Sequence, residues 1–143
     1  ISIGAVVCAA LYSDFGVDTC FAYNRKEAKD HGEGGQLVGA SMYQKRVLVV
    51  DDVITGGTAI RESYDMLTLI GAVPMGVVIA LDRAEKRALD DPISAVQAVV
   101  RDMNIPVVSI VNMPQLQLYL EQSPDFDEDV LTSVSEYRAQ YGV

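Results

Sequence analysis

Near the middle of the chain, two carboxylates and a threonine–glycine turn follow directly on an apolar run. Asp51 and Asp52 come after the apolar residues 47–50, and residues 55–58, which read TGGT, lead into a segment with helical spacing. Successive glycines let backbone N–H groups converge on an anion, and a helix N-terminus adds further donors and partial positive charge. Because carboxylates repel phosphate, we expect the aspartates to face sugar hydroxyls or a divalent cation that bridges to phosphate. The stretch therefore predicts a site for a phosphorylated sugar.

The same stretch allows other interpretations. The plainest is structural, since acid pairs and Gly-Gly turns serve as helix caps and tight turns in many α/β proteins. A P-loop would need Gly-Lys-Ser/Thr, yet no lysine lies between Lys45 and Lys86, and a dinucleotide site would need GxGxxG, which is absent. A phosphoacceptor signalling domain also sets an acidic pair after such a strand to hold magnesium. It would need a late lysine, and none follows Lys86.

A second segment, residues 24–35, is highly charged and rich in glycine. It carries four potential cations, Arg25, Lys26, Lys29 and His31, interleaved with acidic residues. Such a loop loses conformational entropy on ordering without burying apolar surface, so we expect it to be mobile until a ligand holds it. One interpretation is a solvated loop whose charges pair with one another. The other, favoured by four cations close to an anion-binding strand, is a flap that contacts an anionic ligand.

The rest of the chain must position these two segments. Strand and helix patterns alternate, which predicts an α/β fold with a parallel sheet. Residues 47–50 read as a strand buried on both faces, and residues 3–11 read as a buried helix. The polar face of the helix after residue 58, formed by Arg61, Glu62 and Asp65, is expected to be solvated. Further strands are expected over 19–23, 36–40 (strand or turn), 75–81 and 106–111, and further helices over 60–70, 93–103, 114–120 and 130–141, the last interpreted as packing.

Arg83 follows the strand over residues 75–81, in the sequence LDRAE. The carboxyl ends of parallel strands meet at one edge of a sheet, where ligands bind, so Arg83 is expected at the same edge as Asp51 and Asp52. A planar guanidinium there suits a carboxylate clamp. Position alone equally favours an ion pair with Glu85 or Asp82.

Composition limits the class of protein. The 143 residues suit one domain, residues 1–143, and a net charge of −9 disfavours general binding to nucleic acid. No apolar run approaches the roughly 18 residues of a membrane span, and no secretory signal is seen at the start. Cys8 and Cys20 lie in apolar surroundings without CxxC or Cys/His spacing, so we expect buried free thiols and a cytoplasmic location.

Three motifs together resemble a known family. VLVVDDVITGGTA, residues 47–59, looks like the phosphoribosyl-diphosphate (PRPP) signature of type I phosphoribosyltransferases. FAYNRKEAKDHGEGG, residues 21–35, followed by LDRAE, resembles the catalytic loop and base-binding segment of the orotate branch. The resemblance implies a Rossmann-like central parallel sheet flanked by helices, and transfer of ribose 5-phosphate from PRPP to orotate, giving orotidine 5′-monophosphate and diphosphate for pyrimidine synthesis. Alternatives are a phosphoribosyltransferase for another base and a non-catalytic PRPP-binding regulator.

The resemblance also assigns residues. Lys29, Asp51 and Asp52 are expected to be catalytic, and Thr55 and Arg83 to contact orotate. Mg²⁺ is the expected cofactor, held mainly through the diphosphate and not by direct protein ligands. A homodimer is implied, with Lys29 reaching the neighbouring subunit's site, and so is an N-terminal part that precedes Ile1. The expected PRPP-binding set is Arg25, Lys26, Lys29, His31, Asp51, Asp52, Val53, Ile54, Thr55, Gly56, Gly57, Thr58 and Ala59.

Overall fold

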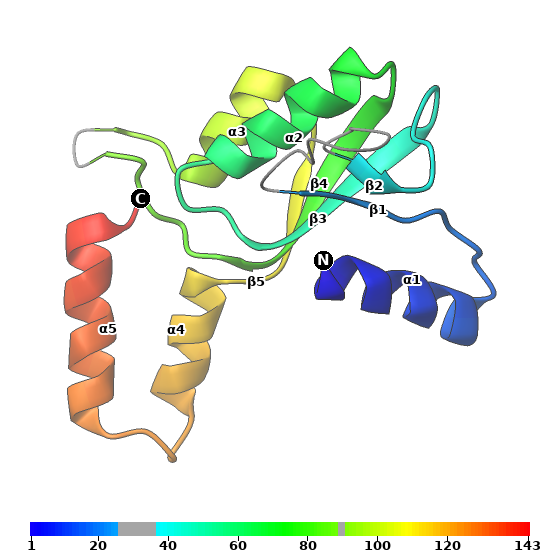
Figure 1. Ribbon diagram of the computed structural model, residues 1–143. Coiled ribbons are helices and arrows are strands. Elements are labelled where there is room, and N and C mark those ends of the chain that lie inside the picture. The colour runs from blue at the N-terminus through cyan, green and yellow to red at the C-terminus, as the bar shows by residue number, and fades with distance from the viewer. Residues whose placement is uncertain (26–36, 89–90) are drawn as a thin grey trace.

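Three parallel strands form the main sheet of the protein. The computed structural model describes residues 1–25, 37–88 and 91–143 (Figure 1). The strands are β3 (Arg46–Val53), β4 (Val73–Asp82) and β5 (Val107–Asn112), in the order β3-β4-β5. The register pairs Val53 with Leu81 and Leu81 with Val111, so the carboxyl ends of all three strands reach one edge. The α/β fold with a parallel sheet that the sequence predicted is confirmed.

A second, two-stranded sheet flanks the charged segment. The antiparallel strands β1 (Ala22–Asn24) and β2 (Leu37–Gly39) pair so that Asn24 lies opposite Leu37. The predicted strands over 19–23 and 36–40 are therefore present, although β1 begins later than expected. The predicted mobile loop itself falls largely on residues outside the described part.

Two helices cover one face of the main sheet. These are α2 (Thr58–Leu69) and α3 (Ala95–Met103), and both lie on the same side in Figure 1. Alternate strand residues point to this side, so Val77 and Ile79 are buried against Ile60 and Val99 in one apolar cluster. Ser94 starts α3 with a reciprocal capping box with Gln97. The core therefore lies between the sheet and these two helices.

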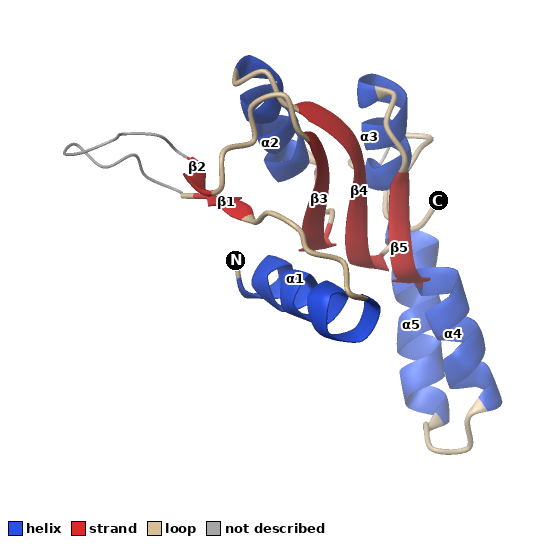
Figure 2. Cartoon of the chain, turned by 90° about the vertical axis from the view of Figure 1, so that its right-hand side faces the viewer, coloured by secondary structure: helices blue, strands red, loops and turns tan. Residues whose placement is uncertain are grey.

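The opposite face of the sheet is largely exposed. Leu48 keeps 57% and Ile110 81% of its surface accessible. The prediction that residues 47–50 are buried on both faces is therefore wrong, because among the described helices only α1 (Ser2–Phe15) approaches β3 from this side (Figure 2). No residue of α1 is buried, which also corrects the expected buried helix over 3–11. A hollow of about 520 Å³ lies between α1 and the sheet, and residues of α1, the β1 segment, β3 and α2 line it.

The C-terminal part forms a pair of helices beyond the end of β5. They are α4 (Met113–Gln122) and α5 (Glu128–Tyr141), which extend away from the sheet side by side (Figures 1 and 2). Both helices were predicted, and the acidic residues Glu128 and Asp129 stand in the first turn of α5, where a helix N-terminus favours negative charge. Of the residues in these two helices only Leu120 is buried.

The two cysteines and the helix lengths bear on further predictions. Cys8 and Cys20 are both free thiols, as expected, but Cys8 is half-buried and Cys20 exposed. The expected burial of Cys20 is wrong because the segment before β1 lies on the surface. Among the described residues, no helix combines the length and apolarity that crossing a bilayer requires.

Candidate active site

The corner between β3 and α2 contains the predicted TGGT turn. Gly57 is the residue before α2 and has φ 80°, in the left-handed region that favours glycine. A Cβ there would lie 2.7 Å from Arg61 Nη1 and 3.0 Å from Val99 Cγ2, whereas at Gly56 the nearest atom would be 3.9 Å away. The turn therefore requires glycine at position 57 and tolerates a side chain at 56.

The corner borders a hollow of about 320 Å³. No side chain caps the N-terminus of α2, and within the described chain no recorded hydrogen bond takes its donor from the backbone N–H groups of residues 55–58. Free amides at a helix N-terminus favour an anion. The predicted phosphate-binding features thus meet at one place. The residues that line the hollow are Asp51, Val53, Ile54, Thr55, Gly57, Thr58, Ala59, Ile60 and Glu62.

The two aspartates at the end of β3 differ in environment. Successive strand residues face opposite sides of a sheet, and only Asp51 lines the hollow. Burial raises the pKa of Asp51, and the neighbouring Asp52 charge adds to that, while the Asp52 N–H, which donates to Asp51 Oδ1 at 3.0 Å, partly opposes it. Asp52 is exposed and its Oδ1 accepts from the Val53 N–H at 2.8 Å. Asp51 is therefore the one suited to accept from a hydroxyl within this hollow.

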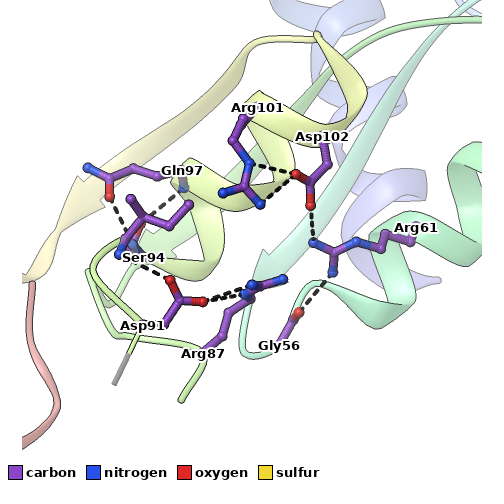
Figure 3. A network of polar contacts seen from close by, with 9 residues as sticks. Gly56, Arg61, Arg87, Asp91, Ser94, Gln97, Arg101 and Asp102 are labelled. Carbon is purple, nitrogen blue, oxygen red and sulfur yellow. Dashed lines mark hydrogen bonds and ion pairs between the residues drawn. The ribbon is translucent and has the colours of Figure 1, made fainter. Parts of the chain in front are cut away.

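Arg61 ties the corner to the helices behind it (Figure 3). Its Nη1 donates to the Gly56 carbonyl at 3.0 Å, and its Nη2 lies 3.1 Å from Asp102 Oδ2 on α3. Hydrogen bonds from Arg101 and Arg61 lower the pKa of Asp102. The predicted solvated face is present at Glu62 and Asp65, which are exposed, but Arg61 is half-buried and makes these contacts. Its position one turn after Gly57 was the available signal, because helical side chains lean toward the preceding turn.

Arg83 is not among the residues that line the hollow. Its Nη2 lies 2.8 Å from Glu85 Oε1 and 2.5 Å from the Tyr137 hydroxyl oxygen. The pairing with Glu85 that sequence position allowed is thus present, and the carboxylate clamp stays a prediction. Tyr137 belongs to α5, whose side chains were expected only to pack. Its role in this contact was missed.

The remaining predicted residues come from the charged segment. Arg25 is half-buried and follows directly on β1. Lys26, Lys29 and His31 lie outside the described residues, so their roles stay predictions. Thr55 is exposed and is among the residues that line the hollow.

The donor set limits how a metal could bind here. The described residues include no group of three or more His, Cys, Asp or Glu side chains with the spacing of a metal site. Asp51 and Asp52 offer hard oxygen ligands, and Mg²⁺ commonly takes one or two carboxylates together with substrate phosphates and water. The site therefore fits Mg²⁺ only in company with a substrate that supplies most of the ligands.

Comparison with known proteins places these features in context. Residues 2–109 match the phosphoribosyl transferase domain family. Across all 143 residues the chain is 50% identical to an orotate phosphoribosyltransferase of Marinobacter nauticus and 48% identical to one of Escherichia coli O139:H28. It spans 65% of the length of each. A crystal structure of orotate phosphoribosyltransferase from Francisella tularensis superimposes with TM-score 0.80 at 38% identity, over 97% of this chain and 64% of that one.

Proposed function

The chain belongs to the phosphoribosyl transferase domain family, and on that premise we propose that it carries out the reaction of an orotate phosphoribosyltransferase. Ribose 5-phosphate would pass from PRPP to orotate, giving orotidine 5′-monophosphate and diphosphate in the synthesis of pyrimidine nucleotides. The observation that carries the choice of orotate is the 50% identity, over every residue of the chain, to an enzyme with that name.

The geometry of the corner supports the sugar-phosphate half of this proposal. Free amides of residues 55–58 and the uncapped N-terminus of α2 suit the 5′-phosphate. The carboxylate of Asp51 lines the same hollow and suits a ribose hydroxyl. Asp52 does not line it, and its assignment to the second hydroxyl rests on the resemblance of the motif. We therefore assign residues 51–59 to the ribose 5-phosphate.

The reaction breaks the anomeric C–O bond to diphosphate and forms a bond from the same carbon to a ring nitrogen of orotate, which loses its proton. The ribose carbon passes through an oxocarbenium-like state, so catalysis depends on stabilising the charge on the departing diphosphate. Arg25, Lys26, Lys29 and His31 are the cations proposed for that task. Arg83 and Thr55 are proposed to bind orotate, and Arg83 would contact the carboxylate of orotate.

We propose Mg²⁺ as the cofactor. When bound, it would neutralise part of the diphosphate charge and make that group easier to displace. Most of its ligands would be diphosphate oxygens and water, so we propose no direct protein ligand for it.

We propose that the protein is a cytoplasmic homodimer in which the loop that carries Lys29 reaches the active site of the other subunit. Two free cysteines are consistent with a reducing compartment. Mixing subunits tests the sharing. Lys29→Ala and Asp51→Asn subunits should each be inactive alone, and a mixed dimer should recover activity if the lysine serves the partner's site. No recovery after confirmed exchange of subunits would reject sharing.

Titration calorimetry and turnover together test the function. The natural full-length protein is titrated with PRPP and Mg²⁺, with and without orotate, and orotidine 5′-monophosphate formation is followed by absorbance. We expect PRPP binding and turnover with orotate. Turnover with a different base would select the other-base transferase, and PRPP binding without any turnover would select the regulator.

A further inference from the structure

Two side chains that follow β4 meet one side chain of α5, which is more than 50 residues away in the sequence. Arg83 Nη2 donates to the Tyr137 hydroxyl oxygen at 2.5 Å and lies 2.8 Å from Glu85 Oε1. The Tyr137 hydroxyl in turn donates to the same Glu85 Oε1 at 2.6 Å. The phenol therefore accepts from the guanidinium and donates to the carboxylate, which closes a triangle of charged and polar groups.

This triangle engages only one end of the Arg83 side chain. Both recorded contacts use Nη2, and a guanidinium has five N–H donors fixed in one plane. Asp82 is otherwise engaged, since its Oδ1 accepts from the Ala84 N–H at 2.8 Å. Among the described residues, Nε and Nη1 of Arg83 thus have no recorded partner. Both two-pronged edges of a guanidinium include Nη2, so the donors left for a ligand carboxylate are single N–H groups, above all those of Nη1 at the tip of the side chain.

The helix that carries Tyr137 is joined by its backbone to the segment after Arg83. The Lys86 N–H donates to the Tyr141 carbonyl at 2.9 Å, and the Val143 N–H donates to the Ala84 carbonyl at 3.0 Å. Figure 1 shows the C-terminus beside this segment. The rings of Tyr137 and Tyr141 lie 4.8 Å apart. The backbone bonds at the end of α5 and the neighbouring ring of Tyr141 therefore fix Tyr137 before any ligand binds.

The charge states of Tyr137 and Arg83 suit this arrangement. The hydrogen bond to Glu85 and burial raise the pKa of Tyr137, so its hydroxyl stays protonated near neutral pH. Burial alone would lower the pKa of Arg83, but the contacts with Tyr137 and Glu85 outweigh it and raise that pKa. The guanidinium therefore remains charged while one of its amino groups is fixed.

We propose that Tyr137, through its hydroxyl, is a positioning residue for Arg83 and thereby sets the affinity for the carboxylate-bearing base. This inference rests on the proposed function, because it takes Arg83 as the residue that binds orotate. Tyr137 and Glu85 hold Nη2, so the side chain has already lost its rotational freedom when Nη1 meets the substrate carboxylate. Preorganisation of this kind strengthens binding without adding a contact to the ligand.

The test replaces Tyr137 with phenylalanine in the natural full-length protein. One hydrogen bond to a charged group is lost, so we expect the KM for orotate to rise about tenfold. The kcat and the KM for PRPP should stay close to wild type, because the residues assigned to PRPP are untouched. Tyr141→Phe is the matched control, since it removes a hydroxyl one turn along α5 that makes no recorded bond among the described residues, and its kinetics should be unchanged.

Each outcome decides the matter. If the wild-type protein forms no orotidine 5′-monophosphate, the proposed function fails and this inference with it. If the wild type is active and Tyr137→Phe leaves the orotate KM unchanged, only the inference fails. If the KM for orotate and the KM for PRPP rise equally while kcat falls, the substitution has caused general damage, and this outcome also overturns the inference. If Tyr137→Phe fails to fold, Glu85→Gln replaces it in the test. This variant keeps an acceptor for the Tyr137 hydroxyl but removes the negative charge paired with Arg83. The KM for orotate must again rise while the KM for PRPP and kcat stay unchanged.

Discussion

Replacing each of the two adjacent glycines of the corner with alanine should give opposite results. At Gly57 the backbone has φ 80°, where an L side chain costs about 1–2 kcal/mol. The new Cβ would also lie 3.0 Å from Val99 Cγ2, and Val99 is fully buried, so it cannot move aside freely. Crowding of that kind adds about 1–3 kcal/mol. Gly57→Ala should therefore lower the free energy of unfolding by about 2–5 kcal/mol.

At Gly56 the same substitution meets open space, with the nearest atom 3.9 Å from the new Cβ and no positive φ. Alanine restricts the unfolded chain, so Gly56→Ala should be neutral or stabilise by about 0.4–1 kcal/mol. Neighbouring positions in one turn thus have predicted effects of different sign.

Urea denaturation of the two variants and the wild type measures these differences through the transition midpoint at constant slope. Calorimetric titration with PRPP measures the second consequence. The Cβ of Gly57→Ala would lie 2.7 Å from Arg61 Nη1, which must then leave the Gly56 carbonyl, so PRPP binding should weaken. Binding by Gly56→Ala should not change. Equal stability of the two variants, or greater damage from Gly56→Ala, would refute the account of the turn.

Three further predictions concern the corner and the charged loop. Arg61→Met removes the hydrogen bond to the Gly56 carbonyl while keeping most of the side-chain bulk. Loss of a bond worth about 1.5 kcal/mol should weaken PRPP binding, measured by calorimetry, by up to about tenfold. Unchanged affinity would show that the corner keeps its shape without Arg61. Lys29→Ala should greatly reduce turnover with PRPP binding largely retained in the full-length protein, and unchanged turnover would discredit the catalytic role of the loop. Because the pKa of Asp51 is raised in the folded state, the folded chain binds the carboxyl proton of Asp51 more tightly than the unfolded chain does. The free energy of unfolding therefore falls as the pH rises through that pKa and Asp51 ionises. In urea denaturation between about pH 4 and pH 7, Asp51→Asn should therefore gain stability relative to wild type with increasing pH, and a constant difference would contradict the assigned burial.

Local patterns in the sequence predicted the elements well because they depend on neighbours along the chain. The alternation of strands and helices, the glycine turn before α2 and the helix over 130–141 are all encoded within a few residues. Which face of the sheet is covered is not encoded in this way. Leu48 reads as buried from its apolar neighbours, yet it is 57% exposed because α2 and α3 both lie on the other face.

The missed residues share a different cause. Arg61 and Tyr137 make their contacts across long stretches of sequence, with Asp102 at a separation of 41 residues and Arg83 at 54. A polar residue on a helix face has the same sequence pattern whether it meets water or a distant partner. The turn between β3 and α2, in contrast, could be predicted because a strand end, two glycines and a helix start occur together within ten residues, Asp51 to Ile60.

The most direct test of the sugar-phosphate site follows the backbone amides themselves. Nitrogen–proton correlation spectra of the chain are recorded while ribose 5-phosphate is added, first to the wild type and then to Gly57→Ala. We expect saturable shifts concentrated on the amides of residues 55–59, strongly reduced in the variant. Shifts confined to other parts of the protein, or none at all at saturating ligand, would contradict the assignment of this corner to the 5′-phosphate.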